Sequence, residues 1–288
     1  MWLLYAFGSA LFAGITAILA KIGIKNTDSN VATAIRTIVI LIFSWFMVFV
    51  VGSFETISSI SSKTLVFLIL SGLTTGGSWL CYFKALQIGD VNKVTPIDKS
   101  STVLTMILAF IILGESLSLT KVIGMIAIGF GTYMMITKKD TSEIKEVQSN
   151  KKWIFYAILS AFLSSLTSIL GKIGIIGVES NLGTAIRTVV VLIMAWIVVF
   201  ITKKQNEIKD IDKTSWIFII LSGITTGLSW LCYYKALQDG DASIVVPIDK
   251  LSIVVTITFS YIFLRERLTK KSFLGLISIF LGTLILLI

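Results

Sequence analysis

The stretch KIGIKNTDSNVATAIRT at residues 21–37 returns as KIGIIGVESNLGTAIRT at residues 172–188. A second stretch, residues 71–105, returns at residues 222–256 with 24 of 35 positions identical. In both cases the second copy lies 151 residues further along, so no gap separates the two stretches. An internal repeat sets the architecture before any single residue is considered. The sequence therefore predicts two similar halves.

Both halves are too apolar for an ordinary soluble domain. The chain is 55% hydrophobic and 14% charged, whereas soluble domains are about half apolar and about a quarter charged. A bilayer core needs about 20 residues of helix, and ten uncharged runs meet that length alone or with a flanking turn. They are residues 1–20, 37–54, 64–83, 100–114, 122–137, 153–171, 188–202, 214–234, 251–264 and 272–288. This pattern predicts an all-α, multi-pass protein of the cell membrane with ten transmembrane helices, five in each half.

The loop charges indicate that the two halves are inverted. An odd number of helices in each half makes the second copy enter the membrane from the opposite side. Residues 203–213 carry four lysines, whereas the equivalent residues 52–63 carry one base and one acid. Because lysine and arginine gather in cytoplasmic loops, we expect repeat 1 at residues 1–138, a cytoplasmic linker at 139–151, repeat 2 at 152–288, and both termini outside. These loops account for the net charge of +9, and no nucleic-acid partner is expected.

Charged residues inside the spans are the candidates for substrate binding or gating. A charge at membrane depth is costly and usually faces a cavity or a partner, although long side chains near helix ends also extend to the interface. The candidates are Arg36, Lys84, Asp98 and Lys99 in the first half, and Arg187, Lys235, Asp249 and Lys250 in the second. We hypothesise that Asp98 pairs with Arg36, and Asp249 with Arg187, as two gates that open in turn.

A polar stripe in the third and eighth spans predicts cavity-lining residues. It comprises Thr75, Ser78, Trp79 and Tyr82, and their equivalents Thr226, Ser229, Trp230 and Tyr233. Packing between helices is the alternative, since small and hydroxyl-bearing residues are common at membrane helix interfaces. Glycine pairs seven residues apart in the fifth and tenth spans, Gly124 with Gly131 and Gly275 with Gly282, indicate packing grooves. A homodimer through these two spans is a further expectation.

The sequence resembles the EamA-type transporters of the drug/metabolite transporter superfamily. The likeness lies in the Gly-x-Ser-Trp-x-x-Tyr-x-Lys-Ala-Leu stretch at residues 76–86 and 227–237, in Gly114-Glu115, and in Pro-Ile-Asp-Lys at 96–99 and 247–250. Arg265 replaces the glycine before Glu266 in the second half. The resemblance implies a tandem fusion of the small five-helix unit, with a central cavity and with the fifth and tenth helices at the periphery. The small multidrug members carry a glutamate in the first helix, and this chain has none there.

These observations predict a secondary transporter that moves a small polar metabolite by alternating access. The excess of bases favours an anionic or zwitterionic substrate, such as an amino acid, held by charge-assisted hydrogen bonds. The chain has no histidine and no phosphate-binding Gly-rich Lys-Ser/Thr loop, so no catalytic, metal or cofactor site is expected. A coupling proton or ion is a further expected partner beside the substrate and the lipid bilayer. The alternatives are a membrane enzyme acting on a lipid-linked substrate and a non-transporting membrane scaffold.

Overall fold

The structure is a computed structural model that describes residues 1–24, 27–88, 97–98, 100–135, 152–264 and 270–288. These residues form helices and turns and no β-strand. The first half contains α1 (Trp2–Gly23), α2 (Ser29–Val51), η1 (Ser53–Ser59), α3 (Ser62–Ile88), α5 (Ser101–Ile112) and α6 (Leu119–Met135). The second half contains α7 (Lys152–Ile175), α8 (Ser180–Ile201), η2 (Gln205–Asp210), α9 (Lys213–Asp239), α10 (Ala242–Lys250), α11 (Ser252–Leu264) and α12 (Lys270–Ile285).

The helices confirm the predicted membrane architecture. Seven described segments are long and apolar enough to cross a membrane, and one of them joins α10 to α11 as a single span, Ala242–Phe259. With the shorter helices α5, α6 and α12, the two halves fit ten membrane helices, five in each. The span formed by α10 and α11 is interrupted at Leu251. Pro247 lies one turn earlier, and a proline inside a helix removes one backbone hydrogen bond and displaces the turn before it.

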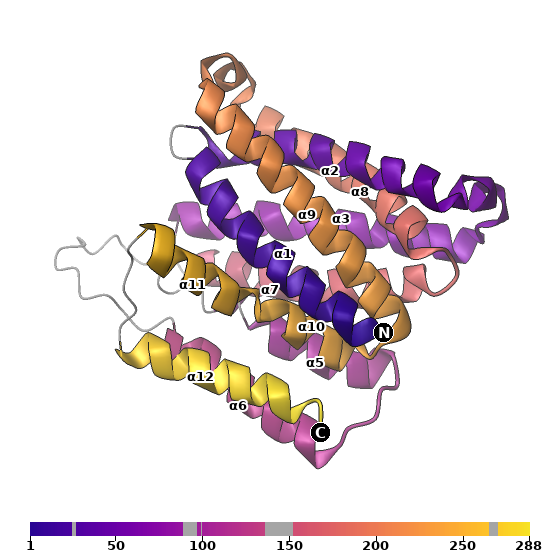
Figure 1. Ribbon diagram of the computed structural model, residues 1–288, viewed down its shortest axis with the longest axis vertical. Helices are drawn as coiled ribbons and strands as arrows, with labels where there is room; N and C mark the ends of the chain where they lie inside the picture. The colour runs from indigo at the N-terminus through magenta and orange to yellow at the C-terminus, as the bar shows by residue number, and fades with distance from the viewer. Residues whose placement is uncertain (25–26, 89–96, 99, 136–151, 265–269) are drawn as a thin grey trace.

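The two halves are interleaved rather than placed side by side. Helix α1 packs along α9, and its repeat equivalent α7 packs along α3, so the first helix of each half lies against the third helix of the other (Figure 1). The N- and C-termini lie at the same end of the molecule (Figure 1), which we call the termini end. The opposite end, where α6 ends and α7 begins, is called the linker end.

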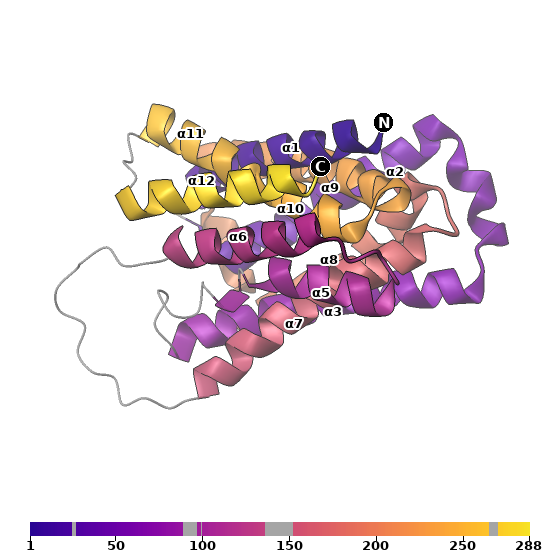
Figure 2. The same ribbon diagram turned by 90° about the horizontal axis from the view of Figure 1, so that it is seen from below.

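Helices α6 and α12 lie side by side in both ribbon views (Figures 1 and 2), and in Figure 1 they form the lower edge of the molecule. Their predicted glycine grooves face each other within one chain. A Cβ added to Gly131 would lie 2.5 Å from the carbonyl oxygen of Gly275, and one added to Gly124 would lie 2.8 Å from that of Gly282. Because these grooves are filled within the chain, the homodimer stays a prediction that would have to use other faces of α6 and α12.

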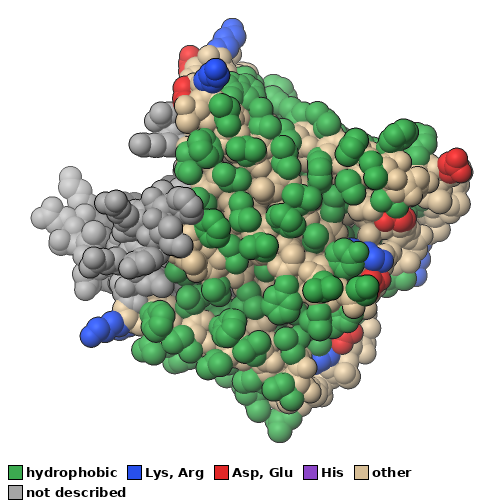
Figure 3. Space-filling view, in the orientation of Figure 1, with side chains coloured by type: hydrophobic (Ala, Val, Ile, Leu, Met, Phe, Trp, Pro, Cys, Tyr) green, Lys and Arg blue, Asp and Glu red, His purple; other side chains and the backbone are tan. Residues whose placement is uncertain are grey.

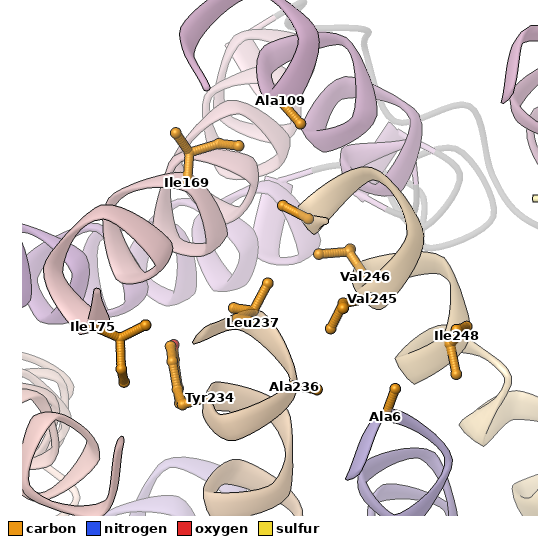
Figure 4. Close-up of a cluster of buried hydrophobic side chains, with 11 residues drawn as sticks. Ala6, Ala109, Ile169, Ile175, Tyr234, Ala236, Leu237, Val245, Val246 and Ile248 are labelled. Atoms are coloured by element: carbon orange, nitrogen blue, oxygen red, sulfur yellow. The ribbon is translucent and has the colours of Figure 1, made fainter. Parts of the chain in front are cut away.

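On the face seen in Figure 3, apolar side chains cover the surface between the two ends, and the charged side chains gather at the ends. Inside, α10 packs at the centre of the largest buried cluster. Val245, Val246 and Ile248 of α10 meet Leu237 of α9 and Ala6 of α1 (Figure 4). The short helix α10 therefore links the two halves in the interior, and its placement bears on the site described below.

The α6–α12 contact gives a stability prediction. We expect Gly131→Ala to lower the free energy of unfolding by about 1–3 kcal/mol, the usual cost of overpacking, because the new Cβ collides with backbone. Gly129→Ala is the matched control on the same helix, since its Cβ would lie 3.4 Å from a Val103 methyl group, an ordinary contact. Unfolding in detergent measures both variants, and equal stability of the two would contradict the packing described here.

Candidate functional site

Two arginines connect the halves, one of them half-buried and the other fully buried. Arg36 on α2 donates a hydrogen bond from Nη2 to Oγ1 of Thr226 on α9, at 2.8 Å. Its repeat equivalent, Arg187 on α8, donates from Nη2 to Oγ1 of Thr75 on α3, also at 2.8 Å. In each case the arginine belongs to one half and the threonine to the other, so the two contacts join the repeats reciprocally.

Glycines bring these helices close enough for the contacts to form. A Cβ added to Gly223 of α9 would lie 2.7 Å from Cβ of Val39 on α2. A Cβ added to its equivalent, Gly72 of α3, would lie 2.7 Å from Cβ of Val190 on α8. Both distances are below normal contact, so only glycine permits this approach. The glycines of the repeated stretch therefore position the arginines against the threonines.

The threonines are oriented to accept from the arginines. Thr226 donates its hydroxyl proton to the carbonyl oxygen of Ser222, and Thr75 donates to that of Ser71. Threonine inside a helix commonly makes this bond to the carbonyl four residues earlier. Because the proton is used along the helix, a lone pair of each oxygen is directed at the guanidinium, which has donors only.

A cavity of about 200 Å³ adjoins Arg36. Its lining residues are Thr33, Arg36, Thr37 and Ile40 of α2, Trp79 of α3, and Thr226 and Trp230 of α9. The Nε of Arg36 is buried and has no hydrogen-bond partner among the described residues. A buried donor with no partner costs free energy, and an acceptor that reached this atom would remove that cost.

A smaller hollow continues from the cavity towards the linker end. It is lined by Asn30, Thr33, Trp79, Ala195 and Val198, of which Asn30 lies at the start of α2 and Val198 near the end of α8. Within the described part of the chain, the side-chain oxygen Oδ1 of Asn30 is also buried without a partner. Asn30, Thr33 and Thr37 thus form a polar stripe along α2 that leads to Arg36.

The two aspartates are held by serines of the other half. Asp98 accepts a hydrogen bond from Oγ of Ser160 on α7 at 3.0 Å. Asp249 accepts one from the equivalent Ser9 on α1 at 2.5 Å.

The expected pairs, Asp98 with Arg36 and Asp249 with Arg187, are absent from the described structure. Each of the four side chains has a hydroxyl partner instead. A serine hydroxyl satisfies a carboxylate across the helix contact without bringing a second charge into the membrane, which is costly.

Contacts at the termini end hold the start of α10, and we call them the closing contacts. The carboxylate of Glu115, after α5, accepts hydrogen bonds from the backbone N–H groups of Ala242 at 2.6 Å and Ser243 at 2.9 Å. Lys121 pairs with Asp241 at 3.0 Å, and Lys172 donates to the carbonyl oxygen of Gly240. A carboxylate at a helix N-terminus also interacts favourably with the helix dipole.

The remaining predicted residues lie apart from the cavity. Lys84 is exposed near the end of α3, and Lys235 pairs with Asp239 at 3.2 Å. Lys250 is half-buried at the end of α10. Lys99 lies outside the described residues.

The tyrosines and serines of the stripe are engaged elsewhere. Tyr82 packs against Ala85 and Ala157, and Tyr233 donates to Ser168 at 2.9 Å. Ser78 and Ser229 bond the serines that hold the aspartates, Ser160 and Ser9. Of the eight predicted lining residues, Trp79, Thr226 and Trp230 border the 200 Å³ cavity.

The sequence prediction missed Thr33, Thr37 and Ile40, which line the cavity with Arg36. Steps of three or four residues connect Thr33 with Arg36 and Thr37, and both of these with Ile40, so the four side chains share one helix face. Helical periodicity applied to α2 would have found them. Glu115 belongs to the Gly114-Glu115 motif of the sequence analysis, but its hydrogen-bond partners lie 127 and 128 residues away. No local sequence pattern predicts a contact between residues so far apart in the chain. In the described part of the chain, no three Cys, Asp or Glu side chains come together as a metal site.

Comparisons with known proteins agree with this architecture. Residues 1–137 and 151–288 each match the EamA-like transporter family. An uncharacterized transporter of Archaeoglobus fulgidus is 23% identical over 99% of this chain and 98% of its own length.

Another relative, an uncharacterized transporter of a Sinorhizobium species, is 41% identical over 137 residues, which are 48% of this chain and 97% of that protein. One half of this chain thus corresponds to a whole relative. A protein of known crystal structure superposes with a TM-score of 0.77 at 15% identity, over 98% of this chain and 95% of that one, which shows the fold. The chain belongs to the EamA-like transporter family.

Proposed function

We propose that this protein is a secondary transporter that moves a small anionic or zwitterionic metabolite across the membrane by alternating access. Membership of a transporter family and the absence of a phosphate-binding loop in the sequence support transport without ATP hydrolysis. The substrate binds in the cavity beside Arg36, between the two halves. Sites of this kind lie near the repeat interface in transporters built from inverted repeats.

The unpartnered Nε of Arg36 is the observation that carries the proposal. A guanidinium offers parallel donors that match the two oxygens of a carboxylate or phosphate. One donor is already used by Thr226, Arg36 borders the cavity, and its Nε has no hydrogen-bond partner among the described residues. The described residues that line the cavity include no aspartate or glutamate, so an anionic group meets no like charge on these walls. Trp79 and Trp230 supply apolar surface for the rest of the substrate.

In alternating access the two ends of the molecule open in turn. At the termini end the closing contacts hold α10 against the first half, while the smaller hollow leads from the cavity to the linker end. The loop charges favour a cytoplasmic location for the linker end. In this state the substrate enters or leaves from the cytoplasm, and release of the closing contacts opens the route to the outside.

The substrate class is tested by currents from purified protein in liposomes on a solid-supported membrane. The liposomes are challenged with anionic, zwitterionic and cationic metabolites, with and without a pH gradient. We expect saturable currents with anionic or zwitterionic compounds. Arg36→Ala removes the anion partner, so we expect a loss of at least tenfold in current, and Arg36→Lys restores part of it through the charge alone.

The exposed Lys209→Gln on η2 serves as the control for loss of one positive charge and should keep the currents. Currents that are strongest for cations, or that persist in Arg36→Ala, would contradict the proposed site.

The closing contacts give a second prediction. In a protein without Cys81 and Cys232, Thr33→Cys should react with a membrane-impermeant thiol reagent from the cytoplasmic side. Glu115→Ala removes two hydrogen bonds to a charged group, each worth about 1.5–3 kcal/mol. We therefore expect it to raise labelling from the outside by about tenfold or more, since about 1.4 kcal/mol corresponds to tenfold.

Glu207→Ala is the control, because it breaks the exposed Lys204–Glu207 pair at η2 and leaves α10 untouched. An unchanged labelling pattern in the Glu115 variant would show that these contacts do not close the cavity.

A further inference from the structure

The two repeat-related arginines have different surroundings. Arg36 borders the 200 Å³ cavity, and no described residue bonds its Nε. Arg187 is 2% exposed and borders neither of the two hollows described above. Exact repeats would give the two residues the same role, so the difference needs a physical cause.

Arg187 is enclosed by hydroxyl groups and aromatic rings. Its Nε donates to Oγ of Ser71 at 3.3 Å, beside the bond from Nη2 to Thr75. The guanidinium carbon lies 4.5 Å from the ring centroid of Tyr234 and 5.2 Å from that of Trp230. Aromatic faces attract a guanidinium, more strongly where water is absent. Within the described residues Arg187 has no acidic partner at ion-pair distance, and these rings and hydroxyls stabilise its charge.

The sequence of the second half supplies this enclosure, and the first half lacks it. Tyr234 corresponds to Phe83, Gly171 to Ala20, and Ser168 to Ala17. A Cβ added to Gly171 would lie 2.8 Å from Cε1 of Tyr234 and 3.1 Å from Oγ of Ser71. The ring of Tyr234 therefore occupies space that only glycine leaves open. Ser168 adds a hydrogen bond from the neighbouring Tyr233, which Ala17 cannot accept.

Trp230 joins the two arginine environments. Its ring lies against Arg187, and the same residue lines the cavity beside Arg36. Arg187 thus lies behind one wall of the cavity and restricts where the indole can move.

We propose that the two arginines do different work: Arg36 binds the anionic group of the substrate, and Arg187 is a positioning residue that holds Trp230 in the cavity wall. The role of Arg36 rests on the proposed function. Arg187, in addition, stays enclosed throughout the transport cycle. The two ends of the protein then open in turn during transport, and the two arginines keep their separate roles. The binding site is asymmetric, and the asymmetry resides in Ser168, Gly171 and Tyr234.

Chemical labelling of arginine tests the enclosure without knowledge of the substrate. Purified full-length protein in liposomes is treated with phenylglyoxal, and peptide mass spectrometry follows modification of Arg36 and Arg187. We expect Arg36 to react at least tenfold faster than Arg187. The triple variant Ser168→Ala, Gly171→Ala and Tyr234→Phe copies the first half, and we expect it to raise the rate at Arg187 about tenfold.

Ala20→Gly is the matched control at the equivalent position and should leave the rate at Arg187 unchanged. An unchanged rate at Arg36 in the triple variant shows that the variant is folded. Tyr234→Leu, which removes the ring without adding bulk at position 171, provides a second route to the same exposure. Equal rates at the two arginines in the unchanged protein, or an unreactive Arg187 in both variants, would overturn the proposal.

The positioning role is tested by the transport currents. With an anion that the protein carries, Arg187→Lys keeps the charge but loses the planar contact with Trp230. We expect it to raise the half-saturating concentration about three- to tenfold while the maximal current stays within about twofold. Arg187→Lys with the same loss of maximal current as Arg36→Ala would contradict a positioning role. Absence of current from the unchanged protein would contradict the proposed function, and the labelling rates would still decide whether Arg187 is enclosed.

Discussion

The hydrogen bond from an arginine of one half to a threonine of the other is the interaction on which the structure depends. It occurs twice, from Arg36 to Thr226 and from Arg187 to Thr75. A guanidinium at membrane depth is costly unless its donors are engaged, and the partner in each case lies across the repeat boundary. Neither half satisfies its own arginine through these bonds. Because the two halves are joined in one polypeptide, each arginine and its threonine partner belong to the same chain.

These arginine–threonine hydrogen bonds require the helices of the two halves to approach closely. Gly72 and Gly223 admit Val190 and Val39 at distances that any side chain would block, and the aspartates are bound by serines of the opposite half in the same reciprocal way. The interface between the halves is thus polar at its centre and sealed by small residues. The 200 Å³ cavity in this interface lies beside Arg36, and the enclosure that fills the equivalent space at Arg187 depends on residues that the first half lacks.

Much of this was predictable from the repeat and from hydropathy. The ten helices, their inversion and the importance of the arginines follow from the offset of 151 residues and from charges inside apolar runs. The hydrogen-bond partners of those charged residues could not be predicted from the sequence. Asp98 and Arg36 are opposite in charge, and their pairing was the natural expectation, but packing across the halves supplies Ser160 and Thr226 instead. Glu115 and its partners at the start of α10 lie far apart in sequence, so only the folded chain brings them together. The differences at Ser168, Gly171 and Tyr234 were readable in the sequence, but their meaning required the contact with Arg187.

The most direct test of an asymmetric anion site is to locate an anion in the protein. Crystals grown with bromide, measured at the bromine absorption edge, give anomalous peaks wherever the ion is ordered. The account predicts a peak within hydrogen-bonding distance of Nε of Arg36, between Trp79 and Trp230, and none at Arg187. A peak at Arg187, or equal peaks at both arginines, would contradict it.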